Sequence, residues 1–158
     1  GKICSENLAL RLNEQGMSIK CLRLAQVMSL TETKSGVMRQ FLEAGITGVP
    51  ITLHKNTSIL REYIYVKDVV EAIYLTLINS VQKGIFNLGS GWAYTLKEYA
   101  QSIAELGPGH PEILFVDSDH IMERTVMKSD KFGKHFKPFK PHSMLEALND
   151  IYYGTGRK

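Results

Sequence analysis

Residues 60–73 read LREYIYVKDVVEAI, and the periodicity of the apolar residues changes within this stretch. In its first part Tyr63 and Tyr65 alternate with Ile64 and Val66, which is the pattern of a β-strand rich in aromatic and β-branched side chains. From Val69 onward the apolar side recurs at helical spacing, at positions 69, 72, 73, 76 and 77. The stretch therefore predicts a short strand that runs directly into a helix.

Two charged residues frame this predicted strand. Asp68 stands where the period changes, and Glu71 follows three residues later, which is the spacing of a helix N-cap and its capping-box partner. We therefore expect Asp68 to cap the helix rather than to bind a ligand. Arg61 stands at the start of the strand, where an arginine is by default a solvated surface residue.

The rest of the chain alternates between helical and strand patterns, which predicts the α/β class. Strands are expected at 18–28, 51–54, 84–88 and 113–116, the first of them nearly continuous in apolar residues and so buried on both faces of a parallel sheet. Helices are expected at 3–15, with Cys4, Leu8 and Leu12 as the apolar stripe, at 36–44, after Thr95, and after Ser143. Residues 120–140 are expected to be irregular.

Composition limits the class of protein. The chain has 158 residues, 44% hydrophobic and 22% charged, which suits a globular domain with its own core. We expect no membrane span, no signal peptide and no metal site, because no apolar run approaches about 20 residues and the five histidines lack ligand spacing. Cys4 and Cys21 lie in segments expected to be buried, which predicts reduced thiols and a cytoplasmic protein.

Two segments have a plain structural interpretation beside a functional one. Residues 87–91, NLGSG, are a strand-ending turn rather than a dinucleotide-binding loop, because the glycine spacing is wrong. The lysine-rich residues 128–142 could bind nucleic acid through charge and stacking, but the net charge is only +3, so a solvated loop is expected. A mild positive charge suits an anionic small ligand.

Six segments, in order, resemble the C-terminal half of the NAD-dependent epimerase/dehydratase family, the extended short-chain dehydrogenases that act on nucleotide sugars. Residues 2–6 are similar to the Lys-x-x-x-Glu that follows the family's catalytic tyrosine, and residues 22–27 to its Leu-Arg-x-x-Asn-Val strand end. Residues 61–68, REYIYVKD, match its most specific signature, Arg-Asp-Tyr/Phe-Ile-x-Val-x-Asp. The remaining likenesses lie in residues 37–53, 86–91 and 136–148.

The resemblance implies roles for the reaction centre. Lys2 would be the catalytic lysine, which hydrogen-bonds the nicotinamide ribose and lowers the pKa of a tyrosine that moves the proton. Ala25 would lie beside the nicotinamide, and Gln26 would contact the substrate where the family usually has asparagine. The cofactor would be NAD or NADP, held mostly by residues upstream of this chain.

The resemblance also implies a nucleotide-sugar site. Arg61 would bind the diphosphate, because a planar guanidinium donates two charge-assisted hydrogen bonds to phosphate oxygens, and Arg124 would be a second diphosphate arginine. Val37 and Thr52 would pack against and hydrogen-bond the nucleotide base. No nucleic acid and no membrane are expected as partners.

The implied fold is α/β: residues 1–30 end a Rossmann-type parallel sheet, and residues 31–158 form the small substrate-binding domain, with 61–79 packing back on the sheet. The family's Gly-rich loop and its tyrosine, four residues before Lys2, are not among these 158 residues, so the chain alone is expected to be inactive and to need an N-terminal Rossmann half. A homodimer through the first helix is also implied.

Two points leave the function open. Met28-Ser29-Leu30 replaces the family's usual Tyr-Gly-Pro, which affects the substrate pocket. The alternative hypothesis is a non-catalytic module that binds nucleotide sugars or a protein without NAD. The sequence distinguishes neither the sugar nor epimerisation from dehydration or reduction.

Overall fold

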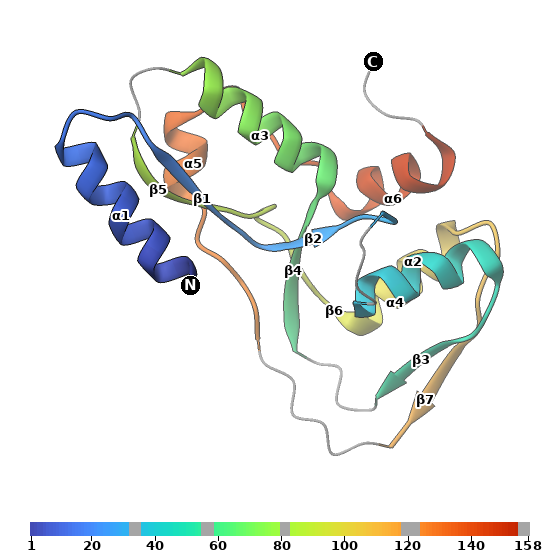
Figure 1. Cartoon of the computed structure of the whole chain (residues 1–158). Helices are drawn as coiled ribbons and strands as arrows, with labels where there is room; N and C mark the ends of the chain where they lie inside the picture. Colours follow the sequence, from blue (N-terminus) through green and yellow to red (C-terminus); the bar gives the residue numbers. More distant parts are fainter. Residues whose placement is uncertain (32–35, 55–58, 80–82, 118–123, 155–158) are drawn as a thin grey trace.

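The computed structural model describes residues 1–31, 36–54, 59–79, 83–117 and 124–154 (Figure 1). The helices in these ranges are α1 (Lys2–Glu14), α2 (Val37–Thr47), α3 (Val66–Ile78), α4 (Leu96–Leu106), α5 (Asp130–His135) and α6 (Met144–Tyr153). The strands are β1 (Lys20–Leu24), β2 (Gln26–Met28), β3 (Ile51–His54), β4 (Leu60–Tyr65), β5 (Gly84–Leu88), β6 (Ala93–Thr95) and β7 (Ile113–Val116). None of these helices is both long and apolar enough to cross a bilayer.

The strands pair mainly in parallel, as the α/β prediction requires. β1 pairs with β5, β2 with β4, and β3 with β7, all in parallel, while β6 adds to β4 in antiparallel orientation. Figure 1 shows α1 and α5 beside β1 and β5, and α2 and α4 beside β3 and β7, in agreement with the contacts between these elements. β4 lies between the two groups.

Two hydrophobic cores lie on the two sides of β4. Tyr63 and Tyr65 face the larger core, which α2, α4 and α6 also build, with Leu42 and Leu148 fully buried in it. Ile64 faces the second core, together with residues of α3, β5 and α5. The predicted alternation is therefore confirmed for Tyr63, Ile64 and Tyr65, and it separates the two cores. Val66 was expected on the side of Ile64, but it is the first residue of α3 and packs against the larger core.

The expectation of one strand over residues 18–28 is wrong. The chain forms two strands that belong to different sheets, β1 and β2, and they separate at Ala25. The backbone N–H of Ala25 donates to the carbonyl of Leu88, the last residue of β5, at 2.9 Å, so pairing with β5 ends where β1 and β2 separate. β1 is not buried on both faces either, since Arg23 and Leu24 are exposed.

The expected apolar stripe of the first helix is wrong as well. Cys4 and Leu8 are exposed, while Ala9 and Asn13 form the buried side. Apolar residues occur on more than one side of α1, so spacing alone did not identify the covered face. The predicted burial of the thiols fails too, because Cys4 is exposed and Cys21 is half-buried, although both are free.

Two further segments differ from expectation. α2 continues through Gly45 and ends only at Gly48, which adopts a left-handed φ of 75°. Position 45 requires glycine, because Tyr152 occupies the space that a Cβ would need. The interval 120–140, expected to be irregular, contains α5; residues 118–123 lie outside the described residues.

The helix caps are confirmed in two of three places. Capping boxes join Thr95 to Glu98 and Ser143 to Glu146. Asp68, however, is not a cap: α3 begins two residues before it, directly after the strand, and Tyr65 takes the N-cap position without a side-chain bond. The Asp68 side chain is buried and paired with another segment instead.

Asp68 accepts two hydrogen bonds from His142, the residue before the cap of α6. The backbone N–H of His142 donates to Oδ2 at 3.0 Å, and its Nδ1 lies 2.5 Å from Oδ1. Asp68 therefore holds the start of α6 against the start of α3. In α6 itself Leu148 is buried as expected, whereas Leu145 is exposed.

Candidate functional site

Three of the residues implied for the substrate site line one cavity. Gln26, Val37 and Arg61 surround a space of about 210 Å³ together with Val27, Gly36, Met38 and Tyr63. Gln26 on β2 is paired in register with Tyr63 on β4, two residues after Arg61, and the first turn of α2 closes the other side. Strand pairing thus brings together residues that are 35 positions apart in the sequence.

The guanidinium of Arg61 is available to an anion in this cavity. Its Nε is buried and has no hydrogen-bond partner within the described residues. A buried cationic N–H without a partner costs free energy, and a carboxylate or phosphate oxygen would remove that cost. α2 also begins here at Gly36, which provides no side-chain cap, so its first N–H groups favour negative charge at the same place.

Backbone pairing of the next residue, Thr125, with β4 places Arg124 near Arg61 in the chain's fold. Thr125 forms a parallel bridge with Arg61. The N–H of Glu62 donates to the carbonyl of Thr125 at 2.8 Å, and the N–H of Thr125 donates to that of Leu60 at 3.2 Å. Arg124 is exposed and is not part of the wall of the 210 Å³ cavity.

Thr52 lies in a different hollow. It is exposed on β3, in a groove of about 600 Å³ between this strand and α2. Gln40 and Phe41 line the same groove, one turn after Val37. α2 therefore borders both spaces, with Val37 and Arg61 in the first and Thr52 in the second.

Lys2 and Ala25 are brought to the same end of the first sheet. Asn13, near the end of α1, exchanges hydrogen bonds with the backbone of Ile19 at 2.9 and 2.7 Å, which fixes the turn from helix to strand. α1 consequently runs antiparallel to β1, and its first turn lies toward the carboxyl end of that strand. Lys2 is exposed in this turn, and Ala25 is the residue that follows β1.

An ion pair fixes this arrangement at the Lys2 end. The guanidinium of Arg23 donates from Nε to Glu6 Oε1 at 2.8 Å and from a terminal nitrogen to Oε2 at 2.6 Å. These hydrogen bonds lower the pKa of the Glu6 carboxyl below its ordinary value. Glu6 lies one turn after Lys2 and Arg23 lies two residues before Ala25, so the pair joins α1 to β1 near both predicted cofactor residues.

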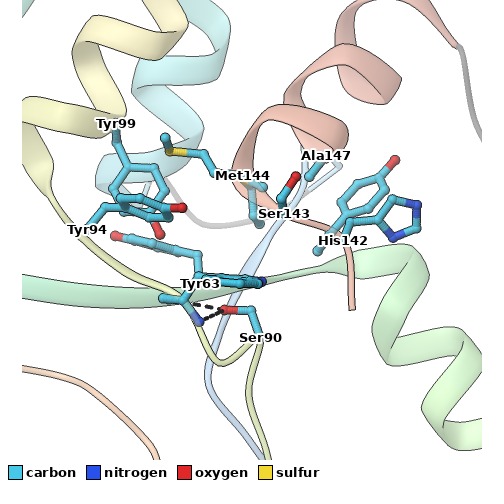
Figure 2. A pocket seen from close by; sticks show the side chains of 11 residues that line it. Tyr63, Ser90, Tyr94, Tyr99, His142, Ser143, Met144 and Ala147 are labelled. Carbon is cyan, nitrogen blue, oxygen red and sulfur yellow. Dashed lines mark hydrogen bonds between the residues drawn. The ribbon is translucent and has the colours of Figure 1, made fainter. Parts of the chain in front are cut away.

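A third hollow, drawn in Figure 2, is closed by aromatic side chains. The rings of Tyr63 and Tyr94 each meet Tyr99 edge to face, at 5.2 and 5.5 Å. Met144 lies beside them, and His142 and Ser143 lie on the other side. The remaining volume of about 10 Å³ is no more than one water needs, so this is packed core rather than a substrate pocket.

These tyrosines support the strand that carries Arg61. The hydroxyl of Tyr99 donates to the carbonyl of Arg61 at 3.5 Å, and burial raises the pKa of Tyr99 above its ordinary value. Tyr94 is paired with Arg61 across the β4–β6 ladder. The cluster therefore stabilises the backbone at Arg61.

Sequence reasoning missed Glu62. It is only 1% exposed, and its two carboxylate oxygens accept the backbone N–H groups of Gly91 and Met127 at 2.9 and 2.6 Å. A signal was present, because Glu62 has the same parity along β4 as the buried Ile64. Among the described residues no group of three or more His, Cys, Asp or Glu side chains could hold a metal ion.

Comparison with known proteins identifies the family. The profile of the NAD dependent epimerase/dehydratase family matches residues 1–89, which is more than half of the chain. The chain belongs to this family, so the resemblance noted from its motifs is confirmed.

Individual relatives are similar over part of their length. The dTDP-4-dehydro-6-deoxyglucose reductase of Escherichia coli is 30% identical over 96 residues, which cover 61% of this chain and 30% of that protein. The ADP-L-glycero-D-manno-heptose-6-epimerase of Fusobacterium nucleatum is 28% identical over 94 residues, covering 60% and 27%.

Solved structures share the fold over nearly the whole chain. The UDP-N-acetylglucosamine 4-epimerase from Bacillus cereus superposes with a TM-score of 0.78 at 26% identity, covering 90% of this chain and 47% of that one. The UDP-glucose 4-epimerase from Thermus thermophilus, in complex with NAD, gives 0.71 at 25% identity, covering 96% and 52%. The matched residues thus span about half the length of these two solved structures and 27–30% of these two curated relatives.

Proposed function

We propose that this chain forms the nucleotide-sugar-binding part of an NAD(P)-dependent epimerase or dehydratase, in which the sugar is transiently oxidised. The observation that carries the proposal is Arg61, whose buried Nε has no partner among the described residues and which lines a cavity shared with Gln26 and Val37. A nucleotide sugar has a diphosphate that suits this guanidinium. Relatives are named for UDP-, ADP- and dTDP-linked sugars.

The substrate would extend along α2. Arg61 would bind the diphosphate, with Arg124 as a second arginine arriving over the solvent-exposed side. The base would reach toward Val37 and then Thr52, since α2 borders both hollows. Gln26 would contact the sugar side of the diphosphate. The contacts to the diphosphate would hold the sugar in place, although the diphosphate itself does not react.

Lys2 and Ala25 fit the nicotinamide end of the cofactor. An exposed ammonium and a small side chain lie at the carboxyl edge of parallel strands, the edge at which α/β proteins bind ligands. When bound, NAD or NADP supplies a hydride acceptor and donor. The part of Lys2 would be to donate a hydrogen bond to the ribose and to favour the ionised form of a tyrosine base.

The proposal includes the division of the chain. Residues 1–30 would complete a Rossmann sheet and 31–158 would form the substrate domain, with 61–79 packing back on the sheet. The 158 residues by themselves would bind substrate but not turn it over, because the Gly-rich loop and the tyrosine would come from an N-terminal half. Ile3 and Leu8, 74% and 57% exposed on α1, suit a helix-to-helix contact in a homodimer.

Binding to nucleotides tests the proposal directly. Calorimetry with UDP, ADP and dTDP, each compared with its own nucleoside, should show that at least one diphosphate binds far more tightly than the nucleoside. Equal affinity for diphosphate and nucleoside throughout would overturn the proposal. The alternative, a module without catalysis, predicts the same binding but no NAD-dependent conversion of a nucleotide sugar by the natural full-length protein.

A further inference from the structure

The buried carboxylate of Glu62 joins three segments that are distant in the sequence. It stands on β4, its Oε1 accepts the N–H of Gly91 in the loop after β5, and its Oε2 accepts the N–H of Met127. Both oxygens are satisfied by backbone groups, although the side chain is only 1% exposed. Charge-assisted bonds of this kind are stronger than neutral ones, so the three segments are held firmly.

The segments that Glu62 joins are those that carry the two arginines. Arg61 directly precedes Glu62, and Arg124 lies three residues before Met127. Backbone hydrogen bonds between Glu62 and Thr125, and between Thr125 and Leu60, lie between these two points. The backbone hydrogen bonds and the side chain of Glu62 therefore both attach residues 124–127 to β4.

The loop after β5 is shaped to admit this carboxylate. A Cβ at Gly89 would overlap Glu62 Oε1, so a residue with a side chain does not fit there. Gly91 supplies the N–H from a φ of 76°, a conformation that glycine adopts readily. The Gly-Ser-Gly turn thus has a physical reason apart from any phosphate binding of its own.

From these contacts we infer that Glu62 is a positioning residue for diphosphate recognition: it fixes the backbone that follows Arg61 and Arg124 so that the two guanidinium groups meet the same ligand. This inference rests on the proposed function. Arg61 needs such support, because its Nε has no partner among the described residues that would orient it. Glu62 provides this support through backbone N–H groups and does not bind the guanidinium, which leaves the guanidinium free for the ligand.

The test compares Glu62→Gln with a matched control, Glu105→Gln, at an exposed position of α4. Glutamine keeps the shape but sets an NH₂ group against a backbone N–H, so one of the two hydrogen bonds is lost. In the natural full-length protein we expect Kd for the diphosphate that binds best among UDP, ADP and dTDP to rise about tenfold or more, the scale of a lost charge-assisted bond. Affinity for the corresponding nucleoside should not change, and Glu105→Gln should change neither.

Comparing ligands separates positioning from general destabilisation. A fall in affinity for the nucleoside equal to that for the diphosphate would overturn the inference, and so would unchanged affinity for both. In a double-mutant cycle Arg61→Ala should cost less in Glu62→Gln than in the wild type, whereas additive effects would also overturn it. If Glu62→Gln does not fold, Glu62→Asp, which keeps the charge but shortens the reach, undergoes the same comparison with the same expected outcome.

Failure of the proposed function has a different signature. If wild-type protein binds no diphosphate better than its nucleoside, the nucleotide-sugar proposal fails, and the role of Glu62 fails with it. If wild-type protein does show that preference and Arg61→Ala removes it, while Glu62→Gln behaves as wild type, only the role of Glu62 is overturned.

Discussion

The hydroxyl of Tyr65 donates a hydrogen bond of 2.6 Å to Oδ2 of Asp150, which joins the end of β4 to the middle of α6. The same oxygen forms an ion pair with Lys67 Nζ at 2.6 Å. Together with the pairing of Asp68 and His142, these contacts attach α6 to the junction of β4 and α3 at two points.

Replacing the buried carboxylate should weaken this attachment. We expect Asp150→Asn to lower the free energy of unfolding by about 1–3 kcal/mol, because Lys67 loses its ionic partner and Tyr65 a charged acceptor. Urea denaturation measures the change. Tyr65→Phe, which removes only the hydroxyl, is the matched comparison and should cost less; equal stability of Asp150→Asn and wild type would show that the contact contributes nothing.

Acidification should act through the same carboxyl. The hydrogen bond from Lys67, followed by that from Tyr65, lowers the pKa of Asp150 below its ordinary value of 3.8. A carboxyl whose pKa is lowered in the folded protein stabilises the fold when the pH is above its ordinary pKa. This contribution is lost as the pH falls from the ordinary pKa through the lowered one. Below about pH 4, Tm should therefore fall less steeply with decreasing pH for Asp150→Asn than for wild type. Parallel curves of Tm against pH for the two proteins would contradict the assignment.

Gly89 should be intolerant of a side chain. Gly89→Ala is expected to lower the free energy of unfolding by about 1–3 kcal/mol, the usual range for overpacking a buried site, because the new methyl group overlaps the Glu62 carboxylate. Gly133→Ala, in α5, is the control: no atom lies within 4 Å of a Cβ at that position, and alanine favours a helix. Thermal unfolding that ranks the two variants the other way would refute the packing argument.

Arg61 should contribute to affinity rather than to stability. Arg61→Ala should weaken binding of the preferred nucleoside diphosphate by about 1.5–3 kcal/mol, the scale of a hydrogen bond to a charged group. Arg11→Ala, at an exposed position of α1, removes the same charge away from the cavity and should leave binding unchanged. Calorimetric titration decides the matter, and wild-type affinity in Arg61→Ala would remove this residue from the site.

Lys2 should matter for turnover and not for folding. In the natural full-length protein Lys2→Met is expected to reduce kcat by about 10²-fold or more, since a group that assists proton transfer is lost. Lys97→Met, at an exposed position of α4, serves as the control. Conversion of a nucleotide sugar by Lys2→Met at the wild-type rate, with an unchanged Tm, would show that Lys2 has no catalytic part.

Local patterns predicted much of this structure. The alternation around Ile64, the capping boxes at Thr95 and Ser143, and the strands at 51–54 and 113–116 all follow from short-range chemistry, and the structure contains each of them. The family could be recognised because six short motifs occur in the right order, although each alone is weak.

The errors have a common physical origin. Asp68 satisfies the spacing of a capping box, but His142, 74 residues away, binds its carboxylate, and no local pattern reveals such a partner. Cys4 and Leu8 have helical spacing, yet the sheet lies against Ala9 and Asn13. Ala25 separates β1 from β2 because the two strands find different neighbours. In each case tertiary contact decided between options that were locally equivalent.

The site shows the same division between local and long-range information. Motif resemblance predicted Gln26, Val37 and Arg61 as site residues, and the three line one cavity. The pairing of β2 with β4 places Gln26 and Arg61 there, and the first turn of α2 places Val37. It did not identify Glu62, because a buried carboxylate is justified only by the backbone donors that surround it, at Gly91 and Met127. The position of Thr52 in a separate groove could not be foreseen either, since it depends on how β3 lies against α2.

The position of β4 between the two cores has a consequence for how the chain comes apart. Tyr63 and Tyr65 belong to one core and Ile64 to the other, so no opening of this strand can expose one core and spare its neighbour. The two sides should therefore melt as a single cooperative unit rather than as separate foldons. Arg61, at the beginning of the same strand, should then keep its place until the whole unit unfolds.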